Sequence, residues 1–76
     1  MKKLWYAVID NTQNPDFGYD CGYGSENLDE AIKMAEELDD TDAFIIIMDT
    51  TGDDPMPVGK VNKNKFTDKW EVTWEE

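Results

Sequence analysis

Residues 27–48 read NLDEAIKMAEELDDTDAFIIIM, and this stretch decides the fold. Its first half repeats apolar residues at helical spacing, which predicts an amphipathic helix from about residue 28 to residue 39. Asn27 is a favourable N-cap, and Glu30 follows at the third position of a capping box. Residues 43–48 form a short, unbroken apolar run rich in β-branched side chains, so we expect a buried central strand there.

The segments that precede the helix have the pattern of two strands. Residues 3–9 are apolar on both faces, which is typical of a strand in the middle of a sheet. Turn-forming residues at 11–16 separate them from residues 17–24, where Phe, Tyr and Cys alternate with Gly and Asp. The sequence therefore predicts a hairpin before the helix.

The segments that follow the central strand predict two or three more strands. Residues 57–61 form a weaker strand whose prolines suit a strand start or an edge, and residues 62–65 form a polar turn. Residues 69–75 alternate again, with two tryptophans and a valine on one face. We expect one compact domain over residues 1–76 with an α+β fold, in the order ββα and then two or three strands. One helix should pack on one face of an antiparallel sheet of four to five strands.

The relative widths of a helix and a sheet add a constraint. A helix is about 10–12 Å across, and neighbouring strands lie about 4.8 Å apart, so one helix covers two or three strands. A sheet of four or five strands must therefore curl, or it must leave apolar surface open to a partner.

The missing residue types exclude several classes of function. The sequence has no His, no Arg and only one Cys, Cys21, which we interpret as a small buried residue. It therefore lacks a Ser-His-Asp or Cys-His arrangement, an arginine finger and an internal disulfide. The acidic clusters at 39–42 and 49–54 do not have the spacing of an EF-hand loop. We expect no catalytic residue, no metal site and no cofactor, and so no enzyme.

The charge is strongly negative and unevenly distributed. Eighteen Asp and Glu against seven Lys give a net charge of −11. The net charge is +2 in residues 1–9, −13 in residues 10–54 and zero in residues 55–76. The simplest interpretation is a solvated surface that keeps the protein soluble. The alternative is an anionic patch for a basic partner, and its sharpest form is a mimic of DNA. The candidate acidic patch is made of Asp29, Glu30, Glu36, Glu37 and Asp40.

The nine aromatic residues are too many for one short core to hide fully. They either form core and cross-strand pairs or line an open sheet face that binds another protein or a second copy. The candidate partner-binding residues are Tyr19, Tyr23, Trp70 and Trp74. The glycine-rich run at 18–24 lacks the Lys-Ser/Thr of a phosphate loop, so we interpret it as a bent strand.

The apolar runs are short. The run that begins at Leu4 ends after six residues at Asp10, and the longest other run, residues 43–48, is also six residues long. Both are too short for a membrane span, and neither continues as a signal peptide would. The sequence therefore predicts a cytoplasmic protein that has no membrane partner.

The order of four segments resembles a family of small acidic uncharacterised proteins from Gram-positive bacteria, often from their mobile elements and prophages. These segments are 5–10, 16–19 with 24–25, 28–35, and 45–49 with 52–55. The resemblance covers residues 4–61. The family has no assigned activity, so the resemblance implies a genomic context and no catalytic residues. Small proteins of such elements often bind and block host proteins.

Taken together, these patterns favour a non-catalytic, small acidic protein-binding module whose partner is another protein or a second copy. The alternative is a DNA-mimic inhibitor of a DNA-binding or nuclease host protein.

The charge distribution also predicts that the protein does not bind nucleic acid directly. Four of the seven lysines lie between residues 60 and 69, next to the acids of the C-terminal segment, so net repulsion from phosphates should dominate. A gel-shift assay at about 0.15 M salt should show no complex with DNA or RNA. Submicromolar binding would contradict this prediction.

Overall fold

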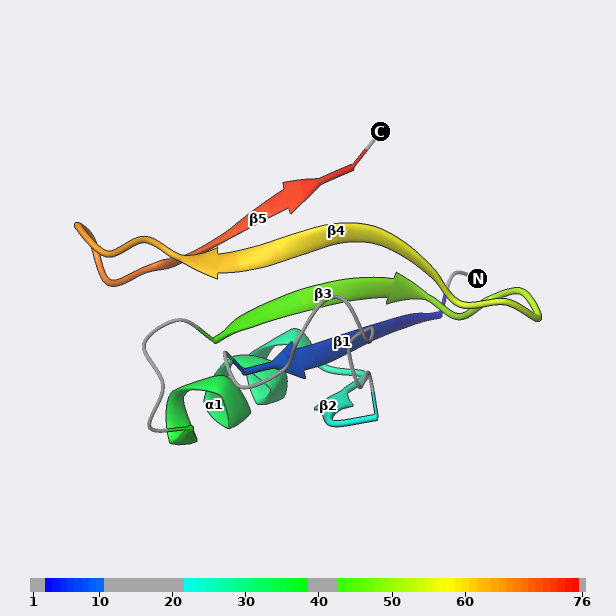
Figure 1. Ribbon diagram of the computed structural model, residues 1–76, viewed down its shortest axis with the longest axis horizontal. Coiled ribbons are helices and arrows are strands. Elements are labelled where there is room, and N and C mark those ends of the chain that lie inside the picture. Colours follow the sequence, from blue (N-terminus) through cyan, green and yellow to red (C-terminus); the bar gives the residue numbers. More distant parts are fainter. Residues whose placement is uncertain (1–2, 11–21, 39–42, 76) are drawn as a thin grey trace.

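The computed structural model describes residues 3–10, 22–38 and 43–75 of the chain (Figure 1). In these residues one helix packs against an antiparallel sheet of five strands, so the predicted α+β fold is confirmed. The sheet order is β2-β1-β3-β4-β5. The elements are β1 (Leu4–Ile9), β2 (Gly24–Ser25), α1 (Leu28–Glu37), β3 (Phe44–Asp49), β4 (Met56–Lys63) and β5 (Trp70–Trp74).

The two strands that are apolar on both faces lie at the centre, as their composition predicts. β1 and β3 pair along their whole length, from Leu4 opposite Asp49 to Ile9 opposite Phe44. Because side chains alternate across a strand, their apolar residues divide into two clusters. The cluster on the helix side contains Val8, Ala31, Ala35, Ile45, Ile47 and Val61. The cluster on the opposite face contains Ala7, Ile9 and Ile46.

The start of the helix is built around Asn27, as predicted. The Asn27 side-chain oxygen accepts hydrogen bonds from the N–H groups of Asp29 (2.9 Å) and Glu30 (3.4 Å). The reciprocal half of the capping box passes through Ser25. The Ser25 hydroxyl donates to Glu30 Oε2 (2.9 Å) and accepts from the Asn27 N–H (3.1 Å). A single hydroxyl therefore ties the edge strand β2 to the first turn of the helix.

Several predicted boundaries need correction. The helix ends at Glu37 instead of residue 39, since Leu38 already has an extended backbone and serves as the C-cap. β4 continues to Lys63, so residues 62 and 63 are strand and not turn. Within the predicted strand 17–24, residues 22 and 23 form a turn and a bend, and β2 begins only at Gly24. Residues 17–21 lie outside the described residues.

β2 approaches β1 closely at Gly24. The Val8 N–H donates to the carbonyl of Tyr23 (2.7 Å), so pairing with β1 starts one residue before the strand itself. At Gly24, a Cβ atom would collide with the backbone carbonyl of Tyr6 on the facing strand. Only glycine allows β2 to approach β1 this closely.

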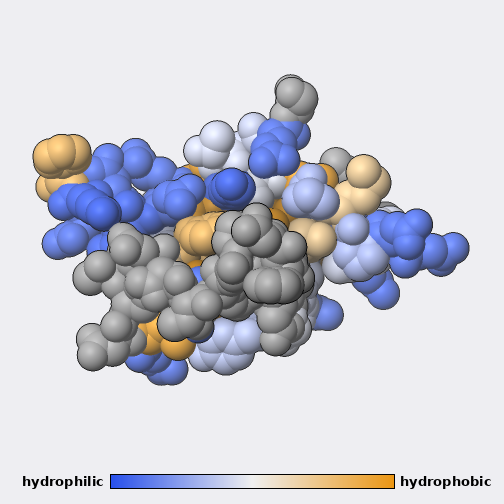
Figure 2. Space-filling view, in the orientation of Figure 1, coloured by the Kyte–Doolittle hydropathy of each residue, from blue (hydrophilic) through white to orange (hydrophobic). Residues whose placement is uncertain are grey.

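The β4–β5 hairpin turn is organised by Asn64. Its side-chain oxygen accepts from the N–H groups of Phe66 (2.8 Å) and Thr67 (3.3 Å), which closes the turn after Lys63. Asp68 adopts a left-handed backbone with φ of 58°. Hydrophilic residues gather at this end of the long axis and at the opposite end, near the β3–β4 turn (Figure 2).

The N-cap arrangement leads to a stability prediction. Asn27→Ala should lower the free energy of unfolding by about 1 kcal/mol, because two N–H groups of the first turn lose their acceptor. Urea denaturation followed by circular dichroism measures the change. Glu26→Ala, at the exposed neighbouring position, is the control and should have little effect. Equal stability of the two variants would show that Asn27 does not cap the helix.

Candidate functional site

The helix covers only part of its side of the sheet. α1 packs against β1, β2 and β3, whereas β4 and β5 continue past it (Figure 1). This confirms the expectation from widths, in which one helix covers two or three strands. The helix-side surface of β4 and β5 is therefore the place where apolar side chains remain open to solvent.

Two residues of β5 lie on this uncovered area. Val72 pairs with Val61 and Trp74 pairs with Gly59. Paired residues of an antiparallel sheet point to the same side, and Val61 belongs to the helix-side cluster. Val72 and Trp74 therefore point to the helix side, yet they are 40% and 55% exposed.

Two residues of β4 extend the same area. Met56 pairs with Asp49, which also pairs with Leu4, a residue packed against the helix-side cluster. Met56 therefore shares that side, and it is 63% exposed. Val58 is half-buried against the same cluster, next to an irregularity in the β3–β4 pairing. We call Met56, Val58, Val72 and Trp74 the open surface.

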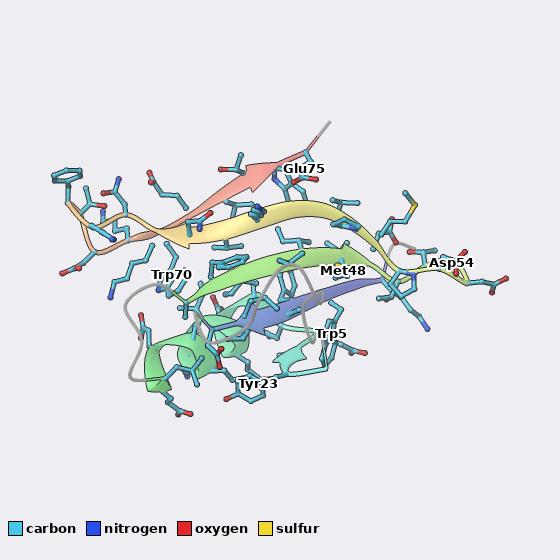
Figure 3. All side chains as sticks on the ribbon, viewed as in Figure 1. Trp5, Tyr23, Met48, Asp54, Trp70 and Glu75 are labelled. Atoms are coloured by element: carbon cyan, nitrogen blue, oxygen red, sulfur yellow. The ribbon has the colours of Figure 1, made fainter. Side chains whose placement is uncertain are left out.

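Trp70 closes one end of this surface. It is half-buried and packs against the helix-side cluster. Its indole Nε1–H donates to Glu36 Oε1 of the helix at 3.1 Å, which joins β5 to α1 across the intervening strands (Figure 3). Along β5, alternate side chains thus change from the half-buried Trp70 to the exposed Trp74. Trp70 holds the helix to the sheet, whereas no helix of the described residues lies above Trp74.

Trp74 lies low on the sheet because Gly59 has no side chain. A Cβ atom at Gly59 would come within 3.2 Å of Trp74 Cε3 and within 2.9 Å of the Thr73 carbonyl oxygen. The indole therefore fills the space that the glycine leaves and covers its backbone, an arrangement that stabilises glycines in strands. One side of the indole contacts the protein, and the rest of the ring is available to a partner.

The predicted aromatic residues do not all come together. Tyr23 is 44% exposed beside β2, at the edge of the sheet opposite to β5. Trp70 and Trp74 share the helix side of β5. Tyr19 lies outside the described residues. The structure therefore joins the two tryptophans and separates Tyr23 from them.

The predicted acidic patch is divided between two flanks of the helix. Glu30 accepts from Ser25 near one edge of the sheet, and Glu36 accepts from Trp70 of the strand at the other edge. Asp29 and Glu37 are exposed. Asp40 lies outside the described residues. Two of the four described carboxylates thus have partners within the fold.

The acidic side chains of the described residues are predicted to form no metal site. Within residues 3–10, 22–38 and 43–75, no group of three Cys, Asp or Glu side chains is placed to hold a metal ion. In the same residues, α1 is too short and too polar to cross a membrane. In the β4–β5 hairpin, the Lys63 ammonium lies 4.0 Å from the Asp68 carboxylate.

Comparison with protein-family models, curated proteins and solved structures finds no match to this chain. The open surface is therefore the feature of the molecule that can indicate a function.

Sequence reasoning missed part of this surface. Val72 could have been found, because it falls between Trp70 and Trp74 in the two-residue repeat of β5. Met56 and Val58 had no such signal. Their side of the sheet depends on the irregular pairing near Met48, which the sequence does not reveal.

The contrast between the two tryptophans of β5 can be tested. Trp70→Ala should lower the free energy of unfolding by about 2–3 kcal/mol, because it removes core packing and the contact with Glu36. Trp74→Ala should cost about 1 kcal/mol or less, since it loses mainly cross-strand contacts. Urea denaturation of both variants measures the difference. Equal losses would show that Trp74 contributes as much to the stability of the fold as Trp70 does.

Proposed function

We propose that this protein is a non-catalytic binding module that recognises another protein through the open surface. The observation that carries the proposal is the gathering of exposed apolar residues. In the described part of the chain, five large hydrophobic residues are exposed, and three of them, Met56, Val72 and Trp74, point to the same side of the β4–β5 hairpin. Exposed apolar side chains that gather on one side of a small domain are typical of a protein interface.

The residue types of the open surface suit such a role. Tryptophan is enriched among the residues that dominate binding energy, and methionine adapts to differently shaped partners. The Trp74 ring already packs against the sheet at Gly59, which has no side chain, so binding of a partner would cost little side-chain entropy at Trp74. The acidic side chain of Glu36 lies beside Trp70, at one end of the open surface. A negative charge at the border of an apolar surface favours a partner that has basic residues around its apolar contact.

The alternative function is inhibition of a DNA-binding or nuclease protein by mimicry of DNA. The net charge of −11 supports this alternative. A mimic needs a row of carboxylates at phosphate-like spacing, about 3.4 Å per charge along one strand. The bonds of Glu30 to Ser25 and of Glu36 to Trp70 direct these two carboxylates to different flanks of the helix. We therefore favour the open surface.

The setting of this function is part of the proposal. We place the protein in the cytoplasm, where a single thiol needs no disulfide partner. The resemblance to small proteins of Gram-positive mobile elements and prophages favours a host protein as the partner. Binding and blocking such a protein requires no catalytic residue.

A capture experiment with variants tests the proposal. The tagged protein is used to recover partners from a Gram-positive bacterial lysate at about 0.05 M and 0.5 M salt. Trp74→Ala should weaken binding of the recovered partner by about 2 kcal/mol or more, as expected of an interface hot spot. Wild-type binding should persist at the higher salt, since apolar contacts are not screened.

Phe66→Ala is the matched control, because Phe66 is 100% exposed but lies in the hairpin turn. It should leave binding unchanged. Mimicry of DNA predicts the reverse pattern. In that case the substitutions Asp29→Asn, Glu36→Gln, Glu37→Gln and Asp40→Asn together should abolish binding, and a DNA duplex should compete with the protein. This result, combined with normal binding by Trp74→Ala, would overturn the proposal.

A further inference from the structure

β5 is an edge strand whose backbone faces outward in a regular pattern. In the described part of the chain, β4 is its single hydrogen-bonded neighbour. The Asn64 N–H donates to the Lys69 carbonyl (2.8 Å), and the Glu75 N–H donates to the Val58 carbonyl (2.9 Å). Hydrogen-bonded positions alternate in an antiparallel pair, so Glu71 and Thr73 also bond to β4. The backbone groups of the three residues between them point to the open edge, namely Trp70, Val72 and Trp74.

We propose that a second copy of this chain pairs with this edge, β5 against β5 in antiparallel orientation, with the two Val72 residues opposite each other on a two-fold axis. This inference goes beyond the proposed function, because it concerns the backbone edge of β5 and names a second copy as the partner there. The result is a continuous sheet with both helices on one side. The open surfaces of the two copies then adjoin.

The sequence of β5 is complementary to itself in this register. Each Trp70 lies opposite Trp74 of the other copy, which forms two aromatic cross-strand pairs on the helix side. On the opposite side, each Lys69 lies opposite Glu75 of the other copy, and Glu71 lies opposite Thr73. Every charged residue therefore faces an opposite charge or a neutral residue.

The neighbouring registers lack this complementarity. A shift of the axis by one residue toward the hairpin places Glu71 opposite Glu71 of the other copy. A shift by one residue toward the C-terminus places Glu71 opposite Glu75 twice. Like charges that face each other directly are destabilising. The charged side chains thus disfavour both neighbouring registers at an edge that would otherwise pair in several ways.

The charge around this edge also favours a second copy here over other places on the molecule. Residues 55–76, which contain the β4–β5 hairpin, carry four lysines and four acids and so have no net charge. Residues 10–54 carry −13 and would repel the same region of another copy. Two copies can therefore approach at β5 with the least repulsion.

Reversing the charges of Lys69 and Glu75, one variant at a time, tests the pairing. These residues lie at the two ends of β5, which Figure 3 marks with the labels Trp70 and Glu75. Sedimentation of the wild-type protein from about 1 to 500 µM should show a concentration-dependent dimer. Lys69→Glu and Glu75→Lys should each weaken the dimer about tenfold or more, because each places two like-charged pairs across the axis. An equimolar mixture of the two variants should form a mixed dimer with nearly wild-type affinity, since both pairs are then complementary.

The Glu75→Lys variant separates the proposal from a general effect of charge. It changes the net charge of each chain from −11 to −9, so general repulsion alone would strengthen the dimer. Our proposal expects a weaker one. Lys33→Glu and Glu37→Lys, on the exposed side of the helix, are the charge-matched controls and should change the affinity less than about threefold. A monomeric wild type over this range, or a mixture that does not recover, would overturn the proposal.

Failure of the dimer and failure of partner binding can be told apart. Met56→Ser alters the open surface but lies outside β5, so it should weaken capture of a lysate partner and leave the dimer intact. Lys69→Glu should weaken the dimer. If the wild type is monomeric while Met56→Ser reduces capture, the second-copy inference fails and the proposed function stands. If the Lys69→Glu and Glu75→Lys variants behave as expected while Met56→Ser has no effect on capture, the second-copy inference stands and the proposed function fails.

Discussion

The ten-residue helix lies against β1, β2 and β3, and within residues 3–10, 22–38 and 43–75 no second layer covers the remaining two strands on that side. The cause is geometric, because a single helix is narrower than five strands placed about 4.8 Å apart. A chain of 76 residues with one helix has no further element in its described part to complete the layer. Val72 and Trp74 are therefore exposed because the helix does not reach β5 at their positions.

Two tryptophans adapt β5 to this incomplete layer in different ways. Trp70 reaches back to the helix and donates to Glu36, which extends the core under the first residue of the strand. Trp74, four residues later, is too far along the strand to do the same and instead lies over Gly59. The same residue type thus has a structural role at one end of β5 and an exposed ring at the other. Distance from the helix, and not residue type, decides between the two.

The sequence predicts the fold better than it predicts the surface, for physical reasons. Both central strands, the helix start at Asn27 and the limited reach of the helix follow from local patterns and simple dimensions. The role of Glu36 does not, because its partner Trp70 is 34 residues away. The position of Met56 depends on an irregular pairing between β3 and β4, which no local pattern encodes. A site made by the pairing of distant strands is seen only when their register is known.

The uneven distribution of charge determines where two copies of the chain can approach each other. A chain with −13 in residues 10–54 is protected from self-association over that region, and an apolar surface placed there would meet strong repulsion from other copies. The apolar residues of β5 lie instead in residues 55–76, which have no net charge, with Lys69 before them and Glu75 after them. Edge strands of soluble proteins commonly use charges to prevent pairing. Here the two flanking charges, Lys69 and Glu75, have opposite signs, so they attract in an antiparallel pair centred on Val72. The charges that disfavour the neighbouring registers therefore permit this one.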